Sequence, residues 1–123
     1  MTSFSALNEL ASICYAASRE NGWWHDINTG KIRGAEAKPE KIALMHSELS
    51  EMLEGVRVGG NDDHVPHLTA EEAELADLLI RAFDYAGKYH LDLALAVRDK
   101  LAYNATRLDH KPANRAGVGG KKF

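Results

Sequence analysis

Two pairs of carboxylates stand at helical spacing in the middle of the chain. Glu48 and Glu51 are three residues apart, and so are Glu74 and Asp77. Residues three apart are neighbours on the surface of an α-helix, so each pair directs two oxygen ligands to one place. Two such helices packed together would make a four-carboxylate pocket, whose mutual repulsion calls for a hard divalent cation. The pattern predicts an Mg²⁺ site, with Mn²⁺ as the substitute ion, of the kind shared with a phosphate-bearing ligand.

The residues around these acids differ from those of an ordinary solvated helix face. The positions four residues after Glu48 and Glu51 hold Met52 and Gly55, and in the second segment only Arg81 follows Asp77 at this spacing. Surface helices tend to balance their acids at this spacing, whereas metal-binding faces leave them unbalanced. The alternative interpretation, two normal charged helix faces exposed to water, remains open at this point.

A matching basic stripe is expected on the last helix of the chain. Lys100, Asn104 and Arg107 follow one another at offsets of four and three residues. Acids that bind Mg²⁺ and cations that bind phosphate are the two halves of a triphosphate site. A di-iron centre is disfavoured, because the Glu-x-x-His motifs that such bundles use are missing from the sequence.

The elements that must position these residues are helices. Thr69-Ala-Glu-Glu72 forms a capping box, which is the clearest helix start in the sequence. Asn21-Gly22 ends the preceding first helix, and Pro39 suits the first position of the second. We expect helices from a cap at Ser3 or Ser5 to Arg19 or Glu20, from Pro39 to Gly55 or Gly59-Gly60, from Thr69 to near Gly87, and from Leu91 or Asp92 to Leu108. No strand pattern competes with them.

Each of these helices carries an apolar stripe that we expect to face a core. Examples are Leu49 and Val56 in the second helix, Leu75 and Leu79 in the third, and Leu101 in the fourth. Apolar residues on more than one face of short helices also favour association of several chains.

Two long connections separate the helices, and each contains residues of chemical interest. Trp23 and Trp24 either cover the end of the bundle or line a pocket for a nucleobase. His64 and His67 superficially resemble a metal site, but a loop containing Pro66 gives them no fixed geometry. We interpret residues 57–68 as a solvated connection.

Length and composition restrict the class of protein. At 123 residues with 45% hydrophobic residues, the chain is expected to form one globular domain over residues 1–108, followed by a mobile basic tail over residues 109–123. The net charge of -3 argues against a nucleic-acid-binding protein. Cys14 has no partner for a disulfide, and neither a signal peptide nor a membrane span is evident. We therefore expect a cytoplasmic protein.

Three segments in order, and a fourth that precedes them, carry a resemblance to a known family. SELSE over Ser47–Glu51 and ELAD over Glu74–Asp77 resemble the Glu-Glu-x-x-Glu and Glu-x-x-Asp motifs of the MazG-like all-α NTP pyrophosphohydrolases, which are related to dimeric all-α dUTPases. KLAYNATR over Lys100–Arg107 is similar to the family's closing segment, and NGWW to its aromatic entry segment. The resemblance covers residues 4–108, and Ser47 departs from it by replacing the leading Glu.

The resemblance implies a fold and a reaction. The fold would be an all-α bundle of four to five helices whose core is completed in a homodimer or a dimer of dimers. The reaction would be Mg²⁺-dependent hydrolysis of a nucleoside triphosphate, a dNTP or non-canonical NTP, to the monophosphate and pyrophosphate. The alternative is a non-catalytic helical module that binds a nucleotide or a protein partner, and a dUTPase-like specificity is a third reading.

It also implies roles for individual residues. Glu48, Glu51, Glu74 and Asp77 would be the metal ligands and catalytic carboxylates, with the number of ions left open by the change at Ser47. Among the substrate-binding residues, Lys100 and Arg107 would hold phosphates and Asn104 the sugar or base edge, while Trp23 or Trp24 would line the base pocket.

Overall fold

The computed structural model describes residues 3–123, and they form an all-α structure. No β-strand occurs among these residues, which contain only two isolated bridges, His25–Ile32 and Asn61–Thr69. The elements in this range are α1 (Ser5–Glu20), a 3₁₀ turn (Ala35–Ala37), α2 (Lys38–Val58), α3 (Ala70–Lys88), α4 (Leu93–Thr106), a second 3₁₀ turn (Leu108–His110) and α5 (Pro112–Ala116). The predicted all-α class is confirmed, and the expected helices are present with small shifts at their ends.

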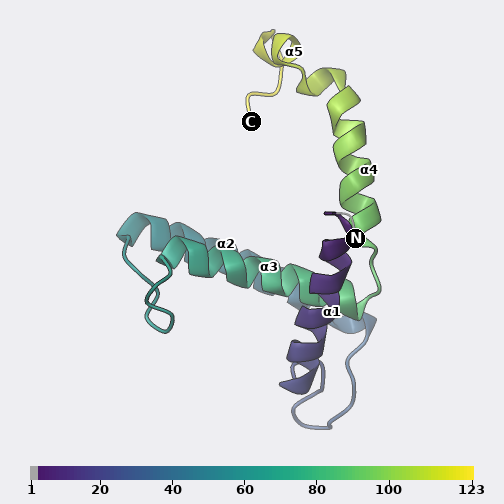
Figure 1. The fold of residues 1–123 in the computed structure, drawn as a ribbon, viewed down its shortest axis with the longest axis vertical. Coiled ribbons are helices and arrows are strands. Elements are labelled where there is room, and N and C mark those ends of the chain that lie inside the picture. The colour runs from purple at the N-terminus through teal and green to yellow at the C-terminus, as the bar shows by residue number, and fades with distance from the viewer. Residues whose placement is uncertain (1–2) are drawn as a thin grey trace.

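Helices α2 and α3 lie side by side as an antiparallel hairpin (Figure 1). α2 ends at Gly59, whose φ of 76° is the left-handed conformation that glycine adopts without strain. α3 begins with the predicted capping box, in which Thr69 Oγ1 accepts from the backbone N–H of Glu72 at 3.0 Å and the Glu72 carboxylate accepts from that of Thr69 at 3.0 Å. The C-terminus of α2 and the N-terminus of α3, on either side of the connecting loop, are therefore both well defined. At α1, by contrast, the cap is Phe4 and not Ser3 or Ser5, and no side chain caps it.

Helix α1 crosses the C-terminal part of α3 at a contact made of small residues (Figure 1). Ala11 and Ala86 are 4% and 2% exposed. A Cβ atom built on Gly87 would lie 2.5 Å from the carbonyl oxygen of Ala11 and 2.6 Å from Cβ of Tyr15. The two backbones thus approach so closely that only glycine fits at position 87.

Trp24 forms the centre of the small core, although it lies in the connection between α1 and α2. It is 1% exposed and contacts the rings of Tyr15 and Tyr89 edge-on, with centroids at 6.2 and 5.7 Å. The ammonium groups of Lys41 and Lys88 lie 4.5 and 5.3 Å from its ring centroid. The connection is therefore held to α1, α2 and α3 by one indole, which agrees with the interpretation that a tryptophan covers the end of the bundle.

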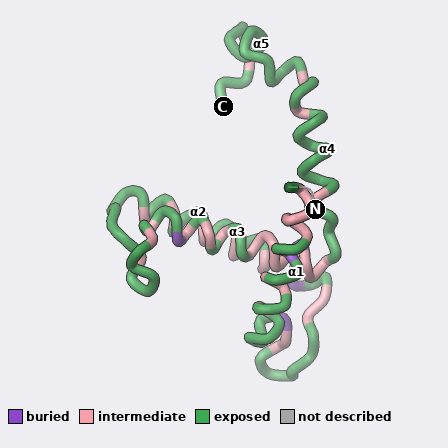
Figure 2. Tube along the Cα trace, in the orientation of Figure 1, coloured by how far each residue is buried: buried purple, intermediate pink, exposed green. Residues whose placement is uncertain are grey.

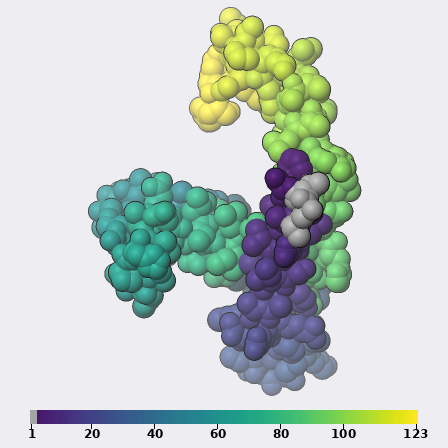
Figure 3. All heavy atoms as spheres, viewed as in Figure 1, coloured from purple at the N-terminus to yellow at the C-terminus, as the bar shows by residue number. Residues whose placement is uncertain are grey.

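Helix α4 leaves this body and, with the tail, forms a projecting arm (Figures 1 and 3). Asp92 caps it by accepting from the backbone N–H of Leu95 at 3.0 Å and also accepts from Asn8 of α1 at 2.9 Å. The tail contains a 3₁₀ turn and α5, with Asn114 donating to the carbonyl of Leu108 at 2.6 Å. The sequence predicted no regular element beyond Asp109, so the short helix there is an addition to the expected fold.

The apolar stripes expected to face a core are largely exposed, so that prediction is wrong for the single chain. Leu49 and Val56 of α2 are 48% and 54% exposed, and Leu101 of α4 is 55% exposed. Figure 2 shows buried positions only near the α1–α3 crossing and at one point of the hairpin. The accessible surface is 8999 Å², whereas a compact monomer of this mass exposes about 6,500 Å². No element within residues 3–123 covers these faces.

Candidate functional site

Three carboxylates meet where α2 and α3 face each other. Glu48 comes from α2, and Glu74 and Asp77 come from successive turns of α3. One oxygen of each lies within 4.8 Å of the others. The spacing of three residues within α3 and the antiparallel packing against α2 together bring about this convergence.

Repulsion within the cluster is evident at Glu74. Partial desolvation raises the pKa of its carboxyl, and three neighbouring carboxylates raise it further. In order of effect these are Asp77, Glu48 and Glu51. The ionised form of Glu74 is therefore destabilised in the absence of a cation. An all-oxygen donor set of several carboxylates with unrelieved negative charge fits Mg²⁺ or Mn²⁺.

Arg81 is the cation nearest to this cluster. Its Nε donates to Oε1 of Glu48 at 2.7 Å, and the two side chains are 39% and 13% exposed. Its charge opposes the rise in the pKa of Asp77, which is caused by desolvation, by Glu48 and, from the α2–α3 loop, by Asp62. The cluster thus has one internal counter-ion for three acids.

A cavity of about 550 Å³ opens beside the cluster, between α1, α2 and α3. Glu48, Asp77 and Arg81 are among the charged residues that line it, together with Lys41 and Asp84. Ile13, Leu44, Ile80 and the aromatic residues Trp23, Trp24 and Tyr85 contribute to its other walls. This volume and this combination of apolar walls with a few charged groups are typical of small-molecule sites.

The two tryptophans play different parts in that cavity. Trp24 is buried, and its Nε1 donates to Oδ1 of Asp84 at 2.8 Å. Trp23 is 66% exposed, and its carbonyl accepts from Nζ of Lys41 at 3.1 Å. Trp24 therefore fixes the wall, whereas Trp23 offers an accessible indole face to a ligand.

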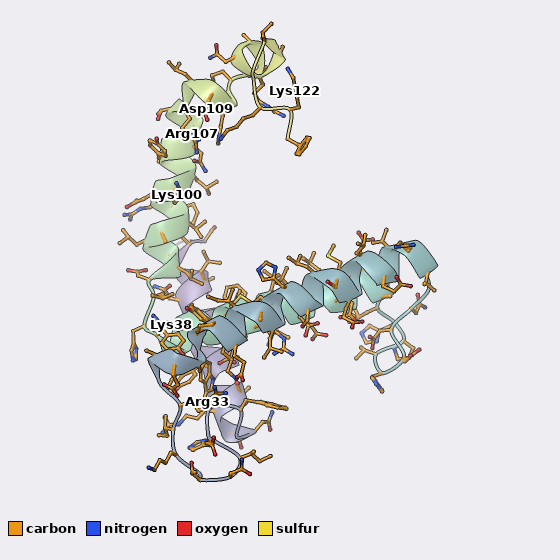
Figure 4. The ribbon with its side chains drawn as sticks, turned by 180° about the vertical axis from the view of Figure 1, so that it is seen from behind. Arg33, Lys38, Lys100, Arg107, Asp109 and Lys122 are labelled. Carbon is orange, nitrogen blue, oxygen red and sulfur yellow. The ribbon has the colours of Figure 1, made fainter. Side chains whose placement is uncertain are left out.

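Four of the predicted site residues, Glu51, Lys100, Asn104 and Arg107, do not join the other three acids within one chain. Glu51 is exposed and lies outside the group of three, although its charge acts on Glu74. Lys100 and Arg107 lie along the α4 arm, away from the α2–α3 hairpin (Figure 4). Arg107 forms a two-point ion pair with Asp109, at 3.0 and 2.7 Å. Within one chain the basic stripe and the acids are separated.

The remaining predicted positions also have defined surroundings. Trp23 and Trp24 have been described above. Asn104 is on the α4 arm, and its Oδ1 is buried with no hydrogen-bond partner among the described residues. Ser47, at the position of the missing family glutamate, is exposed and donates to the carbonyl of Leu44 at 2.6 Å. His64 and His67 are exposed in the loop, which agrees with a solvated connection.

Sequence reasoning assigned no role to Arg81, Asp84 and Asp62. A signal for the first two was available, because they continue the face of Glu74 and Asp77 at offsets of four and three residues. No comparable signal marks Asp62. Its carboxylate accepts from the backbone N–H groups of His64 and Val65 at 3.0 and 2.7 Å, and this loop geometry brings its charge towards α3.

Comparisons of the chain with protein-family models, with curated proteins and with solved structures found no match. Among the described residues, no helix is both long and apolar enough to cross a membrane. The site itself is therefore the basis for a functional assignment.

Proposed function

We propose that this chain is a Mg²⁺-dependent nucleoside triphosphate pyrophosphohydrolase of the MazG-like all-α type. The observation that carries the proposal is the convergence of Glu48, Glu74 and Asp77, of which Glu48 and Asp77 also line a cavity of about 550 Å³. The two features together match the two requirements of a nucleotide, a charged phosphate chain and a largely apolar base.

The acidic residues would hold the cation and prepare the nucleophile. Glu48, Glu74 and Asp77 would be its protein ligands, with Glu51 close enough to add charge or to hold a water molecule. The bound cation would supply charge neutralisation on the phosphate oxygens and the leaving pyrophosphate. One of these carboxylates would also orient the attacking water and accept its proton. The products are the nucleoside monophosphate and pyrophosphate.

The base would occupy the part of the cavity next to the tryptophans. Trp23 has the exposed ring needed for stacking, while Trp24, fixed by Asp84, keeps the wall in place. Base–aromatic stacking contributes about 1–3 kcal/mol and tolerates different bases. Stacking alone therefore supports a nucleotide site without selecting a base.

We further infer that a second copy of the chain completes the site, in a homodimer or a dimer of dimers. The chain exposes roughly 2,500 Å² more surface than a compact monomer of its mass would. Obligate interfaces bury areas of this size. Exposed leucines on α2, α3 and α4 make that surface apolar. A partner arm lying across the hairpin would bring Lys100, Asn104 and Arg107 to the acids.

Pyrophosphate release from a panel of NTPs and dNTPs, including dUTP, tests the activity. The wild type should release it only with Mg²⁺ or Mn²⁺, and Asp77→Asn should be slower by at least about 100-fold. Glu54→Gln, an exposed acid elsewhere on α2, is the matched control and should retain full activity. A wild type that binds nucleotide without releasing pyrophosphate would favour the non-catalytic module, and equal rates for wild type and Asp77→Asn would refute the catalytic assignment.

Subunit mixing tests the shared site. Asp77→Asn and Lys100→Ala are each expected to be weak alone. If every site draws Asp77 from one protomer and Lys100 from the other, co-refolding equal amounts should restore about a quarter of wild-type activity. No recovery on mixing would mean that each protomer supplies both residues itself, whereas a fully active Lys100→Ala on its own would mean that Lys100 has no part in the site.

A further inference from the structure

Arg81 occupies a position between the acidic cluster and the rest of the cavity. It lies one helical turn after Asp77 on α3 and lines the same cavity as Glu48. Its Nε–H is bonded to Glu48. Among the described residues, its terminal nitrogens have no hydrogen-bond partner, and the side chain remains 39% exposed. A guanidinium carries five N–H donors, so most of its capacity is available to a ligand.

Lys41, the other cation that lines the cavity, already interacts with protein groups. Nζ of Lys41 donates to the carbonyl of Trp23 at 3.1 Å and lies 4.5 Å from the ring centroid of Trp24. Desolvation makes the charged form of Lys41 costly and so lowers its pKa. Within the single chain, Arg81 is therefore the cavity cation best placed to meet an anionic group.

The bond to Glu48 also sets the orientation of the guanidinium. A carboxylate on the Nε side restricts rotation of the planar group. Because Glu48 has a second oxygen, it can serve the metal and Arg81 at the same time. Arg81 then stands next to the place where the cation, and with it the phosphate chain, would bind.

We propose that Arg81 binds a phosphate group of the nucleotide through its terminal N–H groups, while Glu48 holds its Nε–H. The inference rests on the proposed function and adds to it a phosphate-binding residue supplied by the same chain as the acids. In the absence of ligand, Arg81 serves as the counter-ion of the acidic cluster, so the same side chain opposes binding of a free cation and favours binding of a triphosphate.

These two roles make opposite predictions for one substitution. Arg81→Gln removes the positive charge beside the three acids, so Mn²⁺ alone should bind about 3- to 10-fold more tightly. The same change removes charge-assisted hydrogen bonds to phosphate, so a triphosphate should bind about 10- to 100-fold more weakly. Arg81→Lys retains the charge without the planar fork, and should bind Mn²⁺ like the wild type but the triphosphate less tightly.

The experiment measures Mn²⁺ binding by electron paramagnetic resonance, and binding of an α,β-methylene nucleoside triphosphate by calorimetry with Mg²⁺ present. Two controls accompany these measurements. The parent nucleoside, which has no phosphate, should bind wild type and Arg81→Gln with affinities that differ by no more than twofold. Arg57→Gln, which changes an exposed arginine near the end of α2, should bind Mn²⁺ and the triphosphate within twofold of wild type. Circular dichroism verifies that each variant is folded, and Arg81→Lys provides the comparison if Arg81→Gln is not.

The outcomes separate this inference from the function on which it rests. Tighter Mn²⁺ with weaker triphosphate binding in Arg81→Gln supports it. Equal triphosphate affinity in wild type and both Arg81 variants overturns it while leaving the proposed function intact. A wild type that binds neither Mn²⁺ nor the triphosphate analogue refutes the proposed function, and this inference with it.

Discussion

Replacing Glu74 by glutamine should make the protein more stable while removing its response to Mg²⁺. Glu74 is within 4.8 Å of both Glu48 and Asp77 in the acidic cluster. Two unit charges at that separation repel by about 1 kcal/mol with the screening of bulk water. Since Arg81 neutralises much of the charge on Glu48, the net gain for Glu74→Gln is about 1–2 kcal/mol at low ionic strength, and less in salt.

The gain should depend on pH in a defined direction. The pKa of Glu74 is raised in the folded chain by desolvation and by its acidic neighbours, so ionising it costs the folded state free energy. This penalty is complete at neutral pH and is relieved as the pH falls through the folded pKa towards the unfolded value of about 4.3. The stability difference between Glu74→Gln and wild type should therefore be largest at pH 7 and disappear below about pH 4.

Urea unfolding followed by tryptophan fluorescence measures both effects. Mg²⁺ should raise the unfolding midpoint of the wild type and leave that of Glu74→Gln unchanged, because the cation binds only the folded wild type. Glu54→Gln, on the exposed face of α2, should respond like the wild type at every pH. A Glu74→Gln protein that is less stable than wild type by the same amount at pH 4 and pH 7 would refute the repulsion argument and assign Glu74 a structural role.

Two further predictions concern the elements that hold the cavity open. Gly87→Ala should lower the free energy of unfolding by at least about 2 kcal/mol, measured in urea, since its Cβ would lie 2.5 Å from the carbonyl oxygen of Ala11; unchanged stability would contradict the close α1–α3 crossing. Trp24→Phe should lower it by about 2–3 kcal/mol through loss of the hydrogen bond to Asp84 and of ring contacts, whereas Trp23→Phe should change it by less than about 0.5 kcal/mol. Equal losses for the two would contradict their different burial.

Local signals in the sequence account for much of the fold. The capping box at Thr69 and the glycine at position 59 are interactions of neighbouring residues, so the ends of α2 and α3 could be predicted from sequence. Spacing on α3 likewise predicts that Glu74 and Asp77 share a face, whereas Glu48 joins them only through the packing of α2 against α3. Glu51 was expected to join them and lies outside, because sequence spacing fixes which residues share a face but not how two helices are rotated against each other.

Other features arise from contacts between distant segments. Nothing in the local sequence links Trp24 to Asp84, which are 60 residues apart and are joined by a hydrogen bond between the α1–α2 connection and α3. The direction of α4 depends on the turn at Leu91 and Asp92 and on the contact of Asp92 with Asn8. Hydrophobic periodicity identified the apolar stripe containing Leu49 but not what covers it, because a pattern marks a buried face without naming the chain that buries it.

Anomalous diffraction of Mn²⁺, in crystals of the protein with an α,β-methylene nucleoside triphosphate, would show directly whether the three acids bind a cation. We expect a peak among the carboxylates of Glu48, Glu74 and Asp77, with oxygen distances of about 2.0–2.2 Å and the phosphate chain beside it. No peak at these residues, or a peak at the loop histidines with these carboxylates still free, would contradict the proposed cation site.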